Sequence, residues 1–287
     1  MRSLLIPALL LSAAISAPLS AQIQQLWVSP AASVSQNLGL TKIEIDYHRP
    51  SVQGREIWGG LVPYGEVWRA GANNATTISF STAVKVAGHE VPAGKYGFFA
   101  IPGKATWTLI LNKVWDQWGA FDYKQDQDLL RFDVTPKAGA NEEWLEYSLD
   151  VKDRATAVAT LAWAKMEVSF PISVDVDAVY QAYLADEVKK ADASTDPKRF
   201  GTYLAAAKYW INRNERLDEA AQLLDKGGKV RESFWTYEWK ARLLVKQGRT
   251  ADALPLLDKA IALSPGQGAP KAYTEGLVKL KAEWTRK

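Results

Sequence analysis

The stretch IEIDYH, residues 43–48, alternates apolar and polar side chains at every position. Because successive side chains of an extended strand point to opposite faces, Ile43, Ile45 and Tyr47 share one face and the polar residues share the other. This alternation is typical of an antiparallel strand that has one face in the core and one in water. We therefore predict that the first half of the chain is built on half-buried antiparallel strands.

The same alternation recurs further along the chain, in residues 77–81, 130–134 and 145–149. Short strands at this spacing, with turn signals between them, predict an antiparallel β-sandwich, with a partly open barrel as the alternative. We assign residues 22–174 to this β-domain. Turns are expected where glycine and proline separate the strands, at Gly39, Gly88, 92–94, 102–103 and 136–140.

From residue 175 onward, the apolar spacing changes to that of an α-helix. Val179, Tyr183 and Leu184 share one helical face, and Asp175 or Asp177 can cap the first turn. We therefore predict an α-helical domain over residues 175–287, so that the chain is an α+β protein of two domains. Small, large and turn positions follow a helix–turn–helix repeat of about 34 residues at Ala241, Leu244, Gly248, Ala253, Leu257, Ala260 and Pro265.

These positions resemble the tetratricopeptide repeat family, over residues 198–287. A last helix, 271–284, is expected to cap the array. Two repeats are few for an independent solenoid, because each repeat buries its face only against its neighbours. An ordinary helical bundle packed on the β-domain is therefore the alternative. A weaker repeat precedes the good one and follows the register with a one-residue slip, at Tyr203, Ala207, Trp210, Ala220 and Leu224.

The first 21 residues have the pattern of a signal peptide. Arg2 gives a positive start, residues 4–15 are almost wholly apolar, and small residues end the segment at Ala21. The apolar run is shorter than the ~20 residues that a permanent membrane-spanning helix needs. We expect cleavage after Ala21 and a periplasmic or secreted protein.

The composition excludes several classes of function. The chain has no cysteine, which excludes disulfides, thiolate metal sites and a cysteine nucleophile. Its formal net charge of +3 gives no strong field for nucleic acid or an anionic membrane surface. No later run reaches the ~18 consecutive apolar residues of a spanning helix. We therefore expect no nucleic-acid partner and no membrane span.

Residues 48–74 are rich in glycine and proline, yet they also contain aromatic and basic side chains. Loops of this kind often present binding groups on a rigid scaffold. Arginine matches a carboxylate or phosphate, and flat rings beside polar groups suit a sugar or a peptide. Alternatively, Trp68 belongs to the core, Arg69 bonds loop carbonyls and the glycines only shape turns. The candidate ligand-binding residues are Arg49, Arg55, Tyr64, Trp68, Arg69, Asn73 and, from a second loop, Trp118.

Five motifs follow one another in this part of the chain, DYHRPSVxGR (46–55), GGLVPYGxVWRxGAN (59–73), PAGxY (92–96), IPG (101–103) and NKxWxQWGA (112–120). These motifs resemble a bacterial family, domain of unknown function 2911, over residues 29–172. The resemblance implies an exported β-domain, sometimes followed by tetratricopeptide-like helices, and it brings no catalytic residues. His48 departs from the pattern, because a smaller or hydroxyl residue is expected there.

Other patterns point only weakly to chemistry. Glu44, Asp46 and His48 share one strand face, which suits a general base or metal but more simply a solvated face. The acidic run 122–128 lacks the central glycine and terminal glutamate of a calcium-binding loop. No nucleotide-binding, zinc-protease or serine-hydrolase motif is present. We therefore expect no metal and no cofactor.

The resulting hypothesis is an exported, non-catalytic binding or adaptor protein. Its β-domain is expected to bind a saccharide, a peptide or a small anion, and its helical repeats to dock a protein partner. The alternative is an envelope hydrolase that uses a pair of carboxylates, one of them Asp46. The two carboxylates of such a pair are distant in sequence, so the second is not identified by a local motif.

Overall fold

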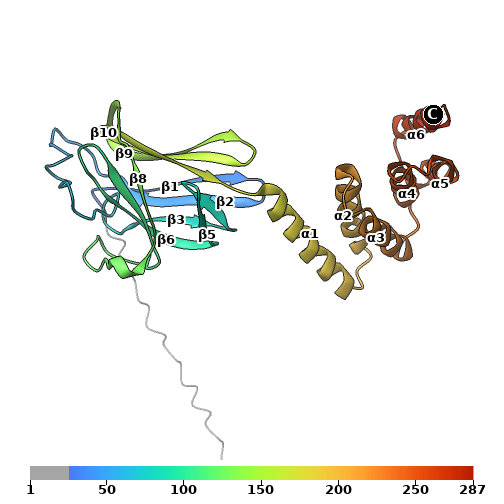
Figure 1. Cartoon of the computed structure of the whole chain (residues 1–287), viewed down its shortest axis with the longest axis horizontal. Helices are drawn as coiled ribbons and strands as arrows, with labels where there is room; N and C mark the ends of the chain where they lie inside the picture. The colour runs from blue at the N-terminus through green and yellow to red at the C-terminus, as the bar shows by residue number, and fades with distance from the viewer. Residues whose placement is uncertain (1–25, 287) are drawn as a thin grey trace, which may run out of the picture.

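The computed structural model describes residues 26–286 of the chain. Antiparallel strands occupy residues 31–173, and six α-helices follow them in the described range (Figure 1). Within the same range, no helix is both long and apolar enough to cross a bilayer. The expected signal peptide and its cleavage site after Ala21 lie outside the described residues.

The larger sheet has six strands in the order β1-β2-β3-β6-β7-β8. Its strand β2 buries Ile43, Ile45 and Tyr47 and turns the residues between them to the other face, which confirms the alternation seen in the sequence. The strands of this sheet are β1 (Ala31–Leu38), β2 (Thr41–His48), β3 (Thr76–Phe80), β6 (Gly94–Ile101), β7 (Trp107–Asn112) and β8 (Asp128–Val134).

The smaller sheet has four strands in the order β5-β4-β10-β9. The turn expected at residues 136–140 is shorter than predicted, because Lys137 and Ala138 already pair with Glu167 and Met166 of β10. The strands of this sheet are β4 (Val84–Val86), β5 (His89–Val91), β9 (Lys137–Asp153) and β10 (Thr156–Ser173).

The apolar faces of the two sheets share one core. The rings of Phe98 in β6 and Phe170 in β10 have centroids 5.5 Å apart, and those of Tyr47 in β2 and Tyr147 in β9 are 4.8 Å apart. Burial of such large rings supplies the main stabilising free energy of a domain of this size. The other face of the six-stranded sheet is partly covered, because Phe99 of β6 and Ile110 of β7 are buried there with Ala75, and the rest of that face forms a surface.

One corner joins the two sheets along their edges. Residues 49–52 continue from β2 onto the edge of β9, where Ser51 and Trp144 form an antiparallel bridge. The Val52 N–H donates to the Glu143 carbonyl, and the Leu145 N–H donates to the Pro50 carbonyl. The backbone directly after His48 is therefore fixed by main-chain bonds rather than left as a mobile loop.

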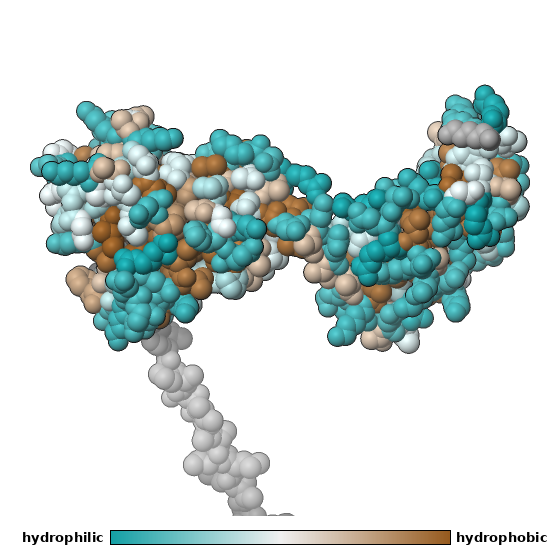
Figure 2. Space-filling view, viewed as in Figure 1, coloured by the Kyte–Doolittle hydropathy of each residue, from teal (hydrophilic) through white to brown (hydrophobic). Residues whose placement is uncertain are grey.

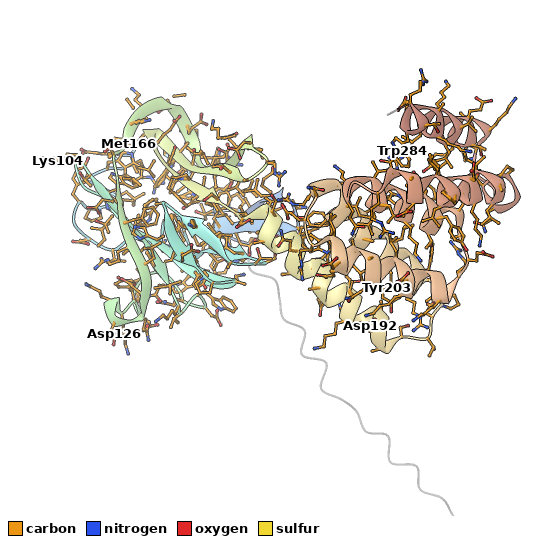
Figure 3. The ribbon with its side chains drawn as sticks, turned by 45° about the vertical axis from the view of Figure 1, so that its right-hand side comes forward. Lys104, Asp126, Met166, Asp192, Tyr203 and Trp284 are labelled. Carbon is orange, nitrogen blue, oxygen red and sulfur yellow. The ribbon has the colours of Figure 1, made fainter. Side chains whose placement is uncertain are left out.

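The helices begin directly after β10. Of the two candidate caps, Asp175 and Asp177, it is Asp175 that caps α1, by accepting a hydrogen bond from the Ala178 N–H. Figure 3 labels Asp192 near the end of α1 and Tyr203 on α2, and the tyrosine hydroxyl donates to this carboxylate at 2.9 Å. The helices are α1 (Val176–Ala193), α2 (Arg199–Arg213), α3 (Leu217–Val230), α4 (Phe234–Lys246), α5 (Thr250–Leu263) and α6 (Lys271–Thr285).

Candidate functional site

The outer face of the six-stranded sheet has a concavity of about 480 Å³. Figure 2 shows that brown, apolar surface is spread over the strands, whereas the visible surface of the helices is mostly teal. We call the hollow on the six-stranded sheet the outer-face concavity. It is lined by Ala31, Ala32, Ser33, Asp46, Tyr47, His48, Asn74, Ala75, Thr77, Lys95, Trp115 and Asp116.

Strand pairing brings the floor of the concavity together. Ser33 of β1 lies opposite Asp46 of β2, and Asp46 lies opposite Thr77 of β3. These side chains therefore stand side by side across three strands, on the face away from the core. Because Ser33 and Thr77 are small, the floor stays low between the taller side chains around it.

One wall consists of a cation, a carboxylate and an aromatic ring. The Lys95 ammonium lies 3.2 Å from an Asp46 carboxylate oxygen and 4.9 Å from the centroid of the Trp115 ring. The Trp115 side chain is 43% exposed, so its ring is accessible to a ligand. Asp116 adds a second carboxylate to the lining.

Buried polar groups hold in place the loop of residues 113–124, which provides Trp115 and Asp116. Asn112 accepts from the Val114 N–H and donates to the Asp128 carboxylate, while Gln117 donates to the Val114 carbonyl. Both amides are buried, so they hold the loop instead of facing a ligand.

A further hydrogen bond holds the C-terminal end of the same loop. The Tyr123 hydroxyl donates to Asp128 at 2.6 Å. Burial raises the pKa of Tyr123, and the hydrogen bond to Asp128 raises it further, so this donor keeps its proton at neutral pH.

His48, the last residue of β2, lies at one end of the concavity floor, beside Arg69. Burial lowers the pKa of His48, and the positive charge of Arg69 lowers it further. The imidazole is therefore neutral at pH 7, with one nitrogen that donates and one that accepts. Burial also lowers the pKa of the Arg69 guanidinium, although an arginine stays charged at any physiological pH.

Two tryptophan rings border the same end of the concavity. The Trp27 and Trp118 rings have centroids 5.2 Å apart, and the Trp27 ring meets the His48 ring edge-on at 6.3 Å. Asn74 forms an isolated bridge with Trp118, which ties the second loop to the segment that precedes β3. An aromatic border therefore extends from Trp115 to Trp27.

Three of the seven residues singled out in the sequence gather at this end. Arg69 lies near His48, and the Trp118 ring packs against the Trp27 ring at an interplanar angle of 39°. Asn73 lies next to Trp118, because its carbonyl accepts from the Gly119 N–H, but its side-chain amide donates to the Ser29 carbonyl.

The other four residues lie elsewhere. Arg49 donates to the Leu145 carbonyl and so ties its segment to β9. Arg55 donates to the carbonyls of Val52 and Ser51 and so braces its own loop. Tyr64 packs over Gly59, at a place where a Cβ would lie 2.7 Å from the tyrosine ring.

Trp68 is the fourth of these. Its ring is buried with Trp58 and Trp163, and its indole N–H donates to the Gly71 carbonyl. This tryptophan therefore belongs to the core and does not face the concavity.

Several lining residues had no signal in the sequence that marked them as a site. Ser33, Thr77 and Lys95 are ordinary polar residues of amphipathic strands, and only the pairing register places them together. In the sequence, Asp46 and His48 share one strand face, whereas Trp115 is marked only as a position of the NKxWxQWGA motif. The register of β1 with β2 and of β3 with β6 brings these residues together, and the sequence alone does not give that register.

Within the part of the chain that the structure describes, no group of three or more acidic, histidine or cysteine side chains is placed to hold a metal ion. The carboxylates of the concavity instead lie beside Lys95, the hydroxyls of Ser33 and Thr77, and the Asn74 amide. This donor and acceptor set suits an organic ligand with several polar groups.

Comparison with known proteins gives one match. The model of a family described as a protein of unknown function, DUF2911, matches residues 29–172. No curated protein and no solved structure matches the chain. Every residue that lines the outer-face concavity falls within the matched range. The chain belongs to the DUF2911 family.

Proposed function

We propose that the protein is an exported, non-catalytic binding protein whose outer-face concavity takes a saccharide. One observation supports this proposal most strongly. A single hollow of about 480 Å³ combines an accessible tryptophan ring with donors and acceptors fixed on paired strands. Ligand sites of small molecules commonly have volumes of ~300–1,000 Å³ and a few polar groups that fix orientation.

The chemistry of the lining favours a saccharide over a peptide. A sugar ring has an apolar face that packs on an aromatic ring, and hydroxyls that both donate and accept. Asp46, Thr77 and Lys95 offer such partners within reach of Trp115. A peptide would favour a free strand edge, where its backbone can pair, whereas the concavity opens on a sheet face.

The first test is replacement of Trp115 by alanine. We expect at least about tenfold weaker binding of the saccharide, because a tryptophan at a contact centre commonly accounts for ~2 kcal/mol of binding free energy. The measurement is a screen on a glycan array followed by calorimetric titration of the best saccharide.

Trp144→Ala is the matched control, because Trp144 is 39% exposed and lies on the other sheet. This variant is expected to keep the affinity of the unaltered protein. Equal affinity of the Trp115→Ala variant would show that the concavity is not the binding site.

For the fold, we propose the name β-sandwich. The shared core between the two sheets supports it, as do the ring contacts that cross from β6 to β10. The corner at Ser51 and Trp144 joins the sheets along one edge only, which is a feature of a partly open barrel as well.

For the helices, we propose a short tetratricopeptide-like array in which α2–α3 and α4–α5 are the repeats and α6 is the cap. Ala241, Ala253 and Ala260 are fully buried, in keeping with the small positions of such a repeat. Gly248 has φ +77° between α4 and α5, a left-handed conformation that favours glycine. We further propose that this array docks a protein partner.

Export is also part of the proposal. Residues 1–21 are proposed as a signal peptide that directs the chain to the periplasm or the medium, on the pattern of charge, apolar run and small residues in the sequence. A saccharide-binding function fits that location, because envelope polymers are found there.

A second candidate, an envelope hydrolase, rests on one observation. Asp46 and Asp116 both line the concavity, and a pair of carboxylates is the equipment of most glycoside hydrolases. Under this hypothesis, Asp46→Asn abolishes turnover of an envelope polysaccharide while the far-ultraviolet dichroism stays unchanged. Reducing-sugar release that persists in this variant would remove Asp46 from the mechanism.

A further inference from the structure

Arg69 is a half-buried cation without a counter-charge. Its Nε atom is buried and has no hydrogen-bond partner, and no ion pair to Arg69 is found among residues 26–286. Two other arginines near the six-stranded sheet are compensated, since Arg131 pairs with Asp128 at 3.5 Å and Arg49 with Glu146 at 3.3 Å. Leaving a guanidinium partly desolvated and unpaired costs stability, which a bound anion would restore.

The backbone places Arg69 on the outer face, beside the concavity. Trp68 pairs with Ala100 of β6 and points into the core, so Arg69, the next residue, points to the opposite face. The chain then runs close to β2, because a Cβ at Gly71 would lie 3.3 Å from the His48 carbonyl oxygen. Arg69 therefore stands next to His48, which lines the concavity.

We propose that the ligand of the outer-face concavity is an acidic saccharide, whose carboxylate pairs with the Arg69 guanidinium and accepts a hydrogen bond from His48. This inference rests on the proposed function and specifies its substrate class. A guanidinium holds a carboxylate through two parallel N–H donors, which makes it the preferred partner for this group.

The surrounding charges leave this end of the concavity positive. Asp46, two residues from His48 on the same strand face, is already paired with Lys95. The elements packed beside His48 contribute only uncharged groups apart from Arg69, namely Ala31 and Ser33 of β1, Asn74 and Trp27. Asp116 is exposed on the loop of residues 113–124 and has no ion pair within the described chain.

The test compares two probes, sodium glucuronate and its methyl ester, which lacks the negative charge and has one additional methyl group. Calorimetric titration at pH 7 is expected to show at least about tenfold tighter binding of the acid, as a charge-assisted pair requires. Because the chain has only two histidines, nuclear magnetic resonance follows both rings separately. Glucuronate is expected to shift the ring signals of His48 and to raise its pKa, while the ring signals of exposed His89, at the start of β5, stay in place.

Arg69→Met is expected to remove the preference for the acid and to keep the weaker binding of the ester. Lys113→Met is the control, because it deletes one exposed charge from the neighbouring loop without touching the lining. This control variant should keep the preference for the acid.

Equal binding of acid and ester, or a preference that survives Arg69→Met, would overturn the inference. In that case saccharide binding that still depends on Trp115 leaves the proposed function standing. Failure of both probes to bind also overturns the inference, and the glycan array then judges the proposed function independently.

Discussion

Replacing Trp107 by alanine is expected to lower the free energy of unfolding of the β region by about 3–5 kcal/mol. Trp107 is 1% exposed and lies at the centre of an aromatic cluster. Its ring centroid is 4.6 Å from that of Trp58 and 6.4 Å from that of Trp68. Alanine would leave a void that the rings around it cannot fill, because each is itself held by the sheets.

Denaturant unfolding followed by tryptophan fluorescence measures this effect. Trp144→Ala is the control, since Trp144 is 39% exposed, and its effect is expected to stay below about 1 kcal/mol. If the two variants lost similar free energy, Trp107 would not be the centre of a tightly packed core.

Replacing Arg242 by methionine is the second large effect, expected to cost the helical region about 3 kcal/mol. Its partner Glu238 is 1% exposed and accepts from the Arg242 Nε at 2.8 Å. The Tyr273 hydroxyl of α6 donates to the same carboxylate at 2.5 Å. Loss of the guanidinium leaves a buried carboxylate without its counter-charge, which costs far more than loss of an exposed pair.

Thermal unfolding of the full chain, followed by dichroism at the helical wavelength, measures this loss. Lys240→Met is the control on the same helix, because Lys240 pairs with Asp225, whose side chain is largely exposed. The control is expected to cost less than about 1 kcal/mol. A loss no greater than that of the control would mean that Glu238 gains little from Arg242.

Much of the β region could be predicted because burial on one face imposes a period of two. The alternation in residues 43–48 survives in β2, since a shift by one residue would place Glu44 and Asp46 in the core. The turn at residues 136–140 is shorter than the sequence predicts, because strand pairing overrides the local turn signals. Proline and glycine mark irregular backbone locally, but β10 is long enough to offer Lys137 and Ala138 partners.

The candidate site could be predicted only in part, because strand register decides it. Arg49 and Arg69 look equivalent in the sequence, as arginines of one glycine-rich segment. Main-chain pairing at the sheet corner sends Arg49 to the Leu145 carbonyl. The pairing of Trp68 with Ala100 turns the next residue, Arg69, to the outer face. The two tryptophans Trp68 and Trp118 differ for the same reason. Trp68 pairs with a strand of the sheet and is buried, whereas Trp118 belongs to the loop of residues 113–124 and is exposed.

The outer-face concavity is tested most directly by mapping the ligand with nuclear magnetic resonance. The indole N–H signals of the tryptophans and the ring signals of His48 are followed as the best saccharide of the array is added. The account predicts saturable shifts at Trp115 and His48, with Trp144 and Trp284 unchanged. Binding that shifts Trp144 or Trp284 and leaves Trp115 and His48 in place would contradict it.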